Sequence, residues 1–380
     1  MAQMKKISVA VIYNFTGEDI YEKIRDVDPK SLDFEPEYNL KVATVTEEYE
    51  AIANALREEG FKVSLLNIKE DVQVLIDLLR KNPPDVVFNL IEFYRDDPVL
   101  EHLIAGLYSL YGVRFTGSGP FTLALCQRKG MTKQLLLANN VLTPRFKILT
   151  EPKIPVRHSL HYPMIVKPAR EDASSGVEKE SVVYNFEELN ERIKKTFDEY
   201  EPPILVEEFI EGRELHVSVL GNEAAEVLPI IEFDFSELPS DHPNIISYDA
   251  KWNPLVESFH RVHAICPAEL SKRVEKKVKA AVLAAYKITG CNDYARLDLR
   301  LTKDNKIYVL EVNPNPDLTE GVSFMQSAEY AGLSFGETLA KIVEYALKRP
   351  APSIPVLQKG KEKLKRPSHT NKKLVRRNFQ

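Results

Sequence analysis

The stretch that decides the fold runs from Arg296 to Asn313 and reads RLDLRLTKDNKIYVLEVN. It contains two apolar segments, 297–301 and 307–312, and the turn-forming pair Asp304-Asn305 lies between them. Two alternating apolar segments joined by such a pair predict a β-hairpin with a two-residue loop.

The register of this hairpin brings polar side chains together. Asp298 is expected opposite Glu311, and Arg296 opposite Asn313; because side chains alternate along a strand, all four share one face. Two carboxylates and an amide oxygen are ligands that Mg²⁺ prefers when nucleotide phosphates complete its shell. A solvated sheet face with paired charges would give the same pattern, so the hairpin alone leaves both interpretations open. The residues expected to point into the core are Leu297, Leu299, Leu301 and Leu310.

The size and composition of the chain bound its class. With 380 residues and 44% hydrophobic content, it can form two or three domains. It has no run of eighteen apolar residues, which predicts no membrane-spanning segment. The apolar run in its first residues, MAQMKKISVAVIYNF, is too short for a signal peptide. Cys126, Cys266 and Cys291 lack CxxC spacing, which predicts free thiols and a cytoplasmic location.

The net charge of −5 is unevenly distributed. Residues 359–380 contain nine Lys or Arg and one acid, so the rest of the chain carries −13. Such a segment can bind nucleic acid or anionic lipid, but this one has a single aromatic residue and no periodicity. A disordered, solvated extension is favoured, and neither nucleic acid nor membrane is an expected partner.

The first third of the chain alternates strands with amphipathic helices, which predicts a parallel sheet with right-handed crossovers. Ligands of such sheets bind beyond the carboxyl ends of the strands. Neither a GxGxxG nor a GxxxxGK[ST] motif occurs, which disfavours an ordinary dinucleotide site or P-loop. The strands are expected at 6–14, 61–66 and 85–90, and the helices at 38–56, 68–79 and 100–111.

Two later segments could bind phosphate. A helix expected at 122–139 carries Lys129 and Lys133 four residues apart. A buried strand ends at Lys167, and the polar loop 169–177 (AREDASSGV) follows it. A lysine beside a Ser-Gly loop suits a phosphate clasp, although a solvent loop with a lysine reaching into water explains the pattern equally well.

The remainder predicts strands at 204–210 and 215–220, a long polar loop at 232–263, and helices at 267–288 and 334–347. The extended backbone at 204–210 could offer its N–H and C=O groups to the edge of an adenine. A carboxylate a few residues later could bind the ribose. A loop as long as 232–263 is either functional or disordered.

Six segments in this order carry a family resemblance. They are FTGSG (115–119), YPMIVKPAREDASSGV (162–177), LVEEFIEGREL (205–215), YDAKW (248–252), ICPAEL (265–270) and YARLDLRL…YVLEVNPNP (294–316). Together they resemble the ATP-grasp superfamily and, within it, the D-alanine–D-alanine ligase group. The resemblance implies an α/β fold (α+β in the C-terminal half), a three-domain ATP-grasp with an N-terminal parallel-sheet domain. The domains are expected at 1–117 (N-terminal, Rossmann-like preATP-grasp), 118–203 (central), 204–350 (C-terminal) and 351–380 (basic tail).

The resemblance also implies roles for individual residues. Asp298, Glu311 and Asn313 match the magnesium ligands. Arg296, Lys251 and Ser174 match catalytic groups, with Arg296 stabilising the tetrahedral intermediate. The residues that match nucleotide contacts are Lys129, Lys167, Lys251, Ser174 and Gly176 for the phosphates, Glu207, Glu208, Phe209 and Ile210 for the adenine, and Glu214 for the ribose.

The implied reaction is an ADP-forming ligation of a small-molecule carboxylate and an amine. ATP would phosphorylate the carboxylate to an acyl phosphate, which the amine attacks. The implied cofactors are ATP and two Mg²⁺, with Mn²⁺ as an alternative ion. A homodimer is left open.

The chain departs from the family where the amino-acid substrates bind. The early glycine-rich segment is replaced by IYNFTGEDIYEK, and the family's serine and tyrosine positions hold Ala173 and Trp252. The family's TSPGMTSHS reads PNPDLTEGV (314–322). These changes favour an amino acid or small peptide other than D-alanine. Additional candidates for substrate contacts are Glu92, Tyr94, Arg95 and Asp96, which a surface loop explains equally well.

Two alternatives stay open at this point. One is a true D-alanine–D-alanine ligase with altered substrate contacts. The other is a non-catalytic ATP-binding protein, against which the intact Arg296, metal ligands and lysines argue.

Overall fold

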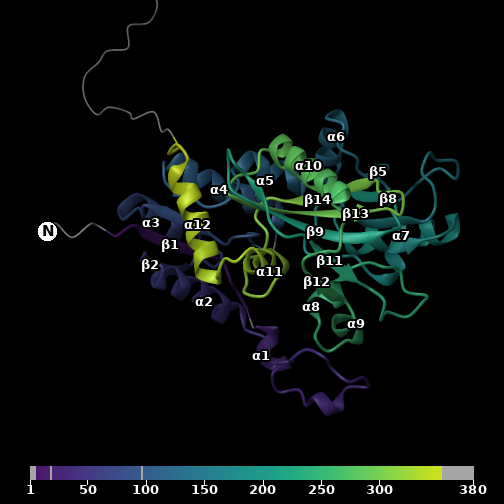
Figure 1. Ribbon diagram of the computed structural model, residues 1–380, viewed down its shortest axis with the longest axis horizontal. Coiled ribbons are helices and arrows are strands. Elements are labelled where there is room, and N and C mark those ends of the chain that lie inside the picture. Colours follow the sequence, from purple (N-terminus) through teal and green to yellow (C-terminus); the bar gives the residue numbers. More distant parts are fainter. Residues whose placement is uncertain (1–5, 18, 96, 353–380) are drawn as a thin grey trace, which may run out of the picture.

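The computed structural model describes residues 6–17, 19–95 and 97–352, and its strands form three sheets (Figure 1). A parallel sheet lies at one end of the molecule, and two antiparallel sheets lie at the other. From residue 353 on, the predicted basic extension lies outside the described residues. Within the described ranges, no helix has the length and apolar character needed to cross a membrane.

The N-terminal sheet is parallel throughout, as the alternation of strands and helices predicts. Its central strand is buried on both faces, with Val9 and Val11 on one side and Ala10 and Ile12 on the other. A parallel sheet is stable when helices cover both faces, and here they do. The strand order is β2 (Lys62–Asn67), β1 (Ser8–Tyr13), β3 (Val86–Asn89) and β4 (Arg114–Phe115).

Two helices cover each face of this sheet (Figure 1). On one face lie α2 (Val45–Glu58) and α12 (Phe335–Lys348), and on the other α3 (Val72–Lys81) and α4 (Glu101–Leu110). Helix α12 comes from the far end of the chain. Its apolar face therefore joins the C-terminal segment to the N-terminal sheet.

Helix α2 begins later than the apolar pattern predicts. The expectation of a helix from residue 38 is wrong, because a capping box fixes the start at Val45. Glu47 N donates to Thr44 Oγ1 at 3.3 Å, and Thr44 N donates to Glu47 Oε2 at 2.8 Å. The residues before Thr44 are therefore not part of the helix.

The central sheet is antiparallel, and α7 (Phe186–Glu199) covers it. Strand β8 pairs with both β5 and β6, so these sheet contacts place it with the central part, across the expected boundary at residue 203. The order is β5 (Phe146–Leu149), β8 (Ile204–Glu208), β6 (Met164–Pro168) and β7 (Val182–Val183).

The C-terminal sheet is also antiparallel and contains the predicted hairpin. One face packs on α10 (Lys272–Thr289), which Ser271 caps, so this helix begins after the predicted residue 267. Helices α5 (Pro120–Gln127) and α6 (Lys129–Ala138) join the same core. The order is β12 (His263–Ile265), β11 (Ile231–Asp234), β9 (Arg213–Leu220), β13 (Tyr294–Leu301) and β14 (Ile307–Asn313), with β10 (Glu226–Val227) on β9.

The long segment 232–263 is partly ordered into regular elements, which the sequence did not predict. Besides the end of β11 and the start of β12, it forms α8 (Tyr248–Trp252) and α9 (Glu257–His260). In Figure 1 these helices lie below the C-terminal sheet, while α10 lies above it. The remaining α-helices of the described residues are α1 (Ile20–Ile24) and α11 (Ser323–Tyr330).

A buried carboxylate ties the parts of the molecule together. Asp293, just before β13, is fully buried and accepts hydrogen bonds from Gly117 N (2.9 Å), Asn222 Nδ2 (3.0 Å) and Arg349 Nη2 (2.9 Å). These partners follow β4, β9 and α12, respectively. Burial raises the pKa of Asp293 to about 6, and the neighbouring Arg349 opposes this shift. The hairpin is thereby fixed relative to the N-terminal sheet.

We predict that Gly212→Ala destabilises the protein. Gly212 has φ of +147°, and a Cβ there would lie 2.3 Å from the carbonyl oxygen of Leu301. The free energy of unfolding, measured with urea, should fall by about 2 kcal/mol or more. Gly106→Ala in α4, where the new methyl group meets nothing within 4 Å, should leave stability unchanged or raise it by up to about 1 kcal/mol. Equal stability of the two variants would contradict this prediction.

Candidate active site

The hairpin β13–β14 has the register that the sequence predicts at its polar end. Arg296 pairs with Asn313, and Asp298 pairs with Glu311. At the other end the prediction is wrong, because the turn is not the two-residue loop Asp304-Asn305. Leu301 pairs with Ile307, and the loop is one residue longer.

A β-bulge compensates for the longer turn. The register shifts between Asp298 and Leu299, so Leu299 pairs with Val309 and Leu310 becomes the additional residue. Leu310 therefore lines a cavity instead of entering the core, and the fully buried Val309 takes its predicted place. The bulge restores the pairing on which the polar face depends.

Three side chains surround Asp298. Arg296 donates from Nε to Oδ1 at 2.8 Å and from Nη2 to Oδ2 at 3.0 Å, and Asn313 Nδ2 donates to Oδ2 at 3.0 Å. His216 Nε2 lies 3.5 Å from Oδ1. Although burial opposes its ionisation, the charge of Arg296 holds the pKa of Asp298 well below its usual range. Burial lowers the pKa of His216 to about 3, which keeps this imidazole neutral.

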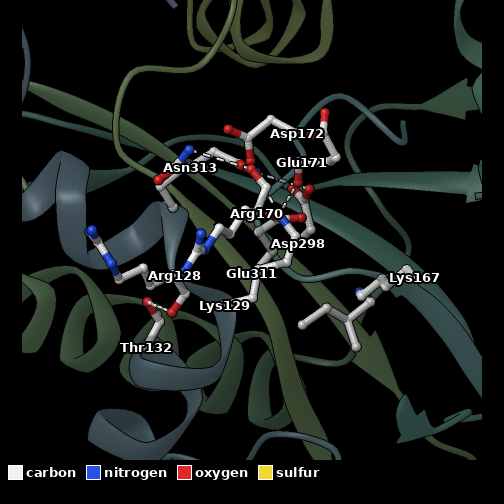
Figure 2. Close-up of polar contacts among 12 residues, drawn as sticks. Arg128, Lys129, Thr132, Lys167, Arg170, Glu171, Asp172, Asp298, Glu311 and Asn313 are labelled. Carbon is white, nitrogen blue, oxygen red and sulfur yellow. Dashed lines mark hydrogen bonds and ion pairs between the residues drawn. The ribbon is translucent and has the colours of Figure 1, made fainter. Parts of the chain in front are cut away.

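Lys129, the first residue of α6, lies among acidic groups (Figure 2). Its Nζ forms an ion pair with Glu311, donates to Asp172 Oδ1 at 3.1 Å, and donates to the carbonyl oxygen of Glu171 at 2.6 Å. Burial would lower the pKa of Lys129, but the charges of Glu311 and Asp172 raise it. The lysine thus carries a positive charge directly beside the predicted metal ligands.

A second group of charges lies on the central sheet. Glu207 is buried between Lys167 Nζ at 2.8 Å from Oε1 and Lys133 Nζ at 2.7 Å from Oε2. Burial opposes ionisation of Glu207, but the two lysines lower its pKa to about 2. The side chain predicted at the adenine edge therefore positions Lys167. Lys133, noted in the sequence only for its spacing from Lys129, also donates to Thr143 Oγ1 at 2.8 Å.

The predicted ribose-binding carboxylate has a cationic neighbour. Glu214 Oε2 lies 2.6 Å from Arg300 Nη2, and the Arg300 guanidinium lies 5.2 Å from the centre of the Phe209 ring. Burial raises the pKa of Glu214, and Arg300 opposes this shift. Arg300 thus contacts both side chains and holds Glu214 close to Phe209.

The loop 169–177 contacts helix α8. Trp252 Nε1 donates to the carbonyl oxygen of Ala173 at 2.9 Å, and Lys251 Nζ lies 4.7 Å from the centre of the Trp252 ring. Burial and the neighbouring Arg296 lower the pKa of Lys251. Trp252 therefore joins helix α8 to the loop 169–177.

Most of these groups line one cavity of about 930 Å³. Of the predicted site residues, only Gly176 is not in its lining; the Gly176 carbonyl accepts from Arg192 Nη2 at 2.9 Å. A cavity of this volume can hold a nucleotide together with a small substrate. The predicted residues in the lining are Lys129, Lys167, Ser174, Glu207, Glu208, Phe209, Ile210, Glu214, Lys251, Arg296, Asp298, Glu311 and Asn313.

The candidate residues that follow the third predicted strand differ in where their side chains lie. Glu92 lines the cavity, whereas Tyr94 is buried and its hydroxyl donates to the Glu70 carbonyl at 2.6 Å. Arg95 lies against the Tyr94 ring, and Asp96 lies outside the described residues. Among the candidates that the structure describes, only Glu92 has a position from which it can contact a substrate.

Sequence reasoning missed several cavity residues. His216 is opposite Asp298 across β9 and β13, and Asp172 contacts Lys129, but each pair is far apart in the sequence. The departure from the family at 314–322 (PNPDLTEGV) indicated the segment that contains Asp317, but it predicted no role for this residue. No local signal identified the cavity residues Tyr21, Tyr38, Glu48, Tyr49 and Phe259.

The donor set on the hairpin fits Mg²⁺. Asp298 and Glu311 offer carboxylate oxygens, and Asn313 donates its amide N–H to Asp298, which leaves its carbonyl oxygen as an acceptor. Hard oxygen ligands of this kind suit Mg²⁺ that also binds phosphate. Lys129 and Lys167, which line the same cavity, suit the phosphates themselves.

Comparison with known proteins finds related sequences. The family model described as "D-ala D-ala ligase C-terminus" matches residues 141–344. The uncharacterized protein y4sG of Sinorhizobium fredii is 32% identical over 79% of this chain and 87% of its own length. A D-alanine–D-alanine ligase of Carboxydothermus hydrogenoformans is 30% identical over 78% of this chain and 92% of its own.

Solved structures share the fold. A D-alanine–D-alanine ligase from Bacillus anthracis complexed with ATP aligns with a TM-score of 0.65 and 20% identity, covering 90% of this chain and 97% of its own. The VanG D-Ala:D-Ser ligase from Enterococcus faecalis aligns with a TM-score of 0.63 and 19% identity, covering 90% and 100%. The α/β fold with a parallel N-terminal sheet, predicted as an ATP-grasp, is confirmed.

We predict that Glu207→Gln destabilises the protein above pH 5. The folded-state pKa of Glu207, about 2, lies below the ordinary value of 4.5 for a glutamate, so the stabilisation from its charge is present above pH 4.5 and is lost as the pH falls through about 2. The difference between these two pKa values corresponds to about 3 kcal/mol in the free energy of unfolding at neutral pH. Urea unfolding from pH 3 to 7 should therefore show a flatter pH dependence in Glu207→Gln than in the wild type. The exposed Glu199→Gln on α7 is the control, and identical pH profiles for wild type and Glu207→Gln would contradict the prediction.

Proposed function

Because this chain belongs to the D-alanine–D-alanine ligase family of the ATP-grasp superfamily, we propose that it is an ADP-forming ligase that joins a carboxylate to an amine through an acyl phosphate. One observation carries the proposal. The predicted phosphate lysines, the metal ligands and Arg296 all line the same cavity.

ATP would lie between the central and C-terminal sheets. Residues 208–210, at the end of β8, would contact the adenine, and Glu214 would accept the ribose hydroxyls. Lys129 and Lys167 would contact the phosphates, with Lys167 held in place by the buried Glu207. Mg²⁺ held by Asp298, Glu311 and Asn313 would offset the charge that moves with the γ-phosphoryl group, and two ions are expected.

The protein's own groups would then stabilise the addition of the amine. The amine attacks the acyl carbon, and negative charge develops on the acyl oxygen before phosphate leaves. Asp298 fixes the Arg296 guanidinium by two hydrogen bonds, which keeps a cation in a constant position for that oxygen. Lys251, held against Trp252, adds a second cation, and Ser174 in the opposing loop supplies a hydroxyl.

The substrate is proposed to be an amino acid or small peptide other than D-alanine. Ala173 removes a hydroxyl from the family's substrate contacts, and Trp252 uses its N–H on the Ala173 carbonyl. Losing a buried hydrogen-bond partner strongly lowers discrimination for the original substrate. A D-alanine–D-alanine ligase remains the second candidate, because the relative from Carboxydothermus hydrogenoformans carries that name. The cytoplasmic location and the homodimer stay predictions.

A trapping assay tests the reaction without knowledge of the amine. Hydroxylamine intercepts acyl phosphates as hydroxamates, so ATP, MgCl₂ and hydroxylamine are incubated with a panel of carboxylates. The proposal predicts a hydroxamate and equimolar ADP for some carboxylate other than D-alanine. A hydroxamate from D-alanine alone favours the second candidate, and no ADP with any carboxylate or carboxylate–amine pair favours a non-catalytic ATP-binding protein.

We predict that Arg296→Ala lowers kcat by about 10²–10³-fold, as expected for loss of one oxyanion donor. The measurement is phosphate release with the carboxylate identified by trapping, and the KM for ATP should change much less. The matched control is Arg273→Ala, which removes an exposed arginine of α10 outside the cavity and should leave kcat unchanged. A kcat within about threefold of the wild type would remove Arg296 from the proposed role.

A further inference from the structure

Arg300 of β13 has a guanidinium that lines the cavity but takes no part in the proposed reaction. Only 3% of its side chain is exposed. Arg300 is the direct cross-strand partner of Glu214 on β9, and because side chains alternate along a strand, it shares the face that carries Asp298. Burying a charge costs free energy unless hydrogen bonds and opposite charges compensate, so an arginine in this position depends on its partners.

The guanidinium of Arg300 binds three acceptors. Nη2 lies 2.6 Å from Glu214 Oε2, and Nη1 donates to the carbonyl oxygen of Gly212 at 3.1 Å, just before β9. Nη2 also donates to the carbonyl oxygen of Asn244, in the segment 235–247 between β11 and α8. The planar fork of an arginine holds several acceptors in fixed directions, which the ammonium of a lysine cannot do.

The same guanidinium lies beside the residues predicted to contact adenine. Its central carbon is 5.2 Å from the centre of the Phe209 ring, a distance that allows a cation–π contact. Ile245, next to Asn244, is buried in a small core against which Phe209 packs. Arg300 therefore connects the predicted adenine and ribose contacts with the segment that leads to Lys251.

Glu214 has one cationic partner. In the described part of the chain, Arg300 is the only cation within ion-pair distance of this carboxylate. A carboxylate can accept hydrogen bonds from two neighbouring ribose hydroxyls only when both of its oxygens keep a fixed direction. The contacts of Arg300 with two backbone carbonyls fix the guanidinium, and the guanidinium in turn fixes Glu214.

Resting on the proposed ligase function, we infer that Arg300 is a positioning residue for the nucleotide, which orients the Glu214 carboxylate toward the ribose hydroxyls and holds the segment 235–247 beside it. Arg300 acts through Glu214, so its contribution depends on the hydroxyls that Glu214 accepts. A nucleotide without the 2′-hydroxyl lacks one of these hydrogen bonds. Loss of Arg300 should therefore weaken the binding of ADP more than the binding of 2′-deoxy-ADP.

Binding of these two nucleotides tests the inference. Isothermal titration calorimetry of the full chain in MgCl₂ compares ADP with 2′-deoxy-ADP. The wild type should bind ADP about tenfold more tightly, because a hydrogen bond to a charged acceptor is lost with the hydroxyl. Arg300→Met, which keeps a long side chain but removes the guanidinium, should reduce this preference to about twofold or less. Arg300→Lys, which keeps the charge but not the planar fork, should reduce it to about threefold.

The control is Arg273→Met, which replaces an exposed arginine of α10 outside the cavity and should leave the preference unchanged. A purely structural role of Arg300 would weaken both nucleotides equally, so a wild-type preference in either Arg300 variant overturns the inference. Arg300→Lys keeps a cation beside Glu214 and carries the test if Arg300→Met does not fold. Failure of the wild type to bind ADP would contradict the proposed function, whereas ADP binding without a preference over 2′-deoxy-ADP overturns this inference alone.

Discussion

The antiparallel pairing of Arg296 with Asn313 and of Asp298 with Glu311 is the constraint on which the site depends. It places two carboxylates and an amide on one face, where Arg296 holds Asp298 and Lys129 holds Glu311. A shift of one residue would turn every one of these side chains into the apolar core. The register is secured at one end by the bulge after Asp298 and at the other by the buried Asp293.

The two halves of the cavity differ in the side chains that line them. The half beside the hairpin is lined by Lys129, Lys167, Asp298 and Glu311. The half between α2, β3 and the loop after β14 is lined by Tyr21, Tyr49 and Asp317. Because charge and shape at the substrate end set discrimination between substrates, the reaction type can be kept while the substrate changes.

Local sequence patterns predicted which helices and strands form better than they predicted where these elements begin and end. The parallel N-terminal sheet follows from alternating strands and helices, and it is confirmed. The start of α2 was misplaced because the capping box at Thr44 outweighs the apolar pattern before it. The turn of the hairpin was also wrong, but the longer loop and the bulge cancel, so the polar pairing was predicted correctly despite two local errors.

The sequence by itself determined which side chains share a face of the hairpin, because alternation along a strand depends only on residues near one another in the chain. It also determined the order of motifs that identifies the family. Only the tertiary structure decided that Glu207 holds Lys133 and Lys167, that α12 packs on the first sheet, and that His216 lies beside Asp298. These contacts join residues far apart in the sequence, and the packing of whole sheets and helices brings them together.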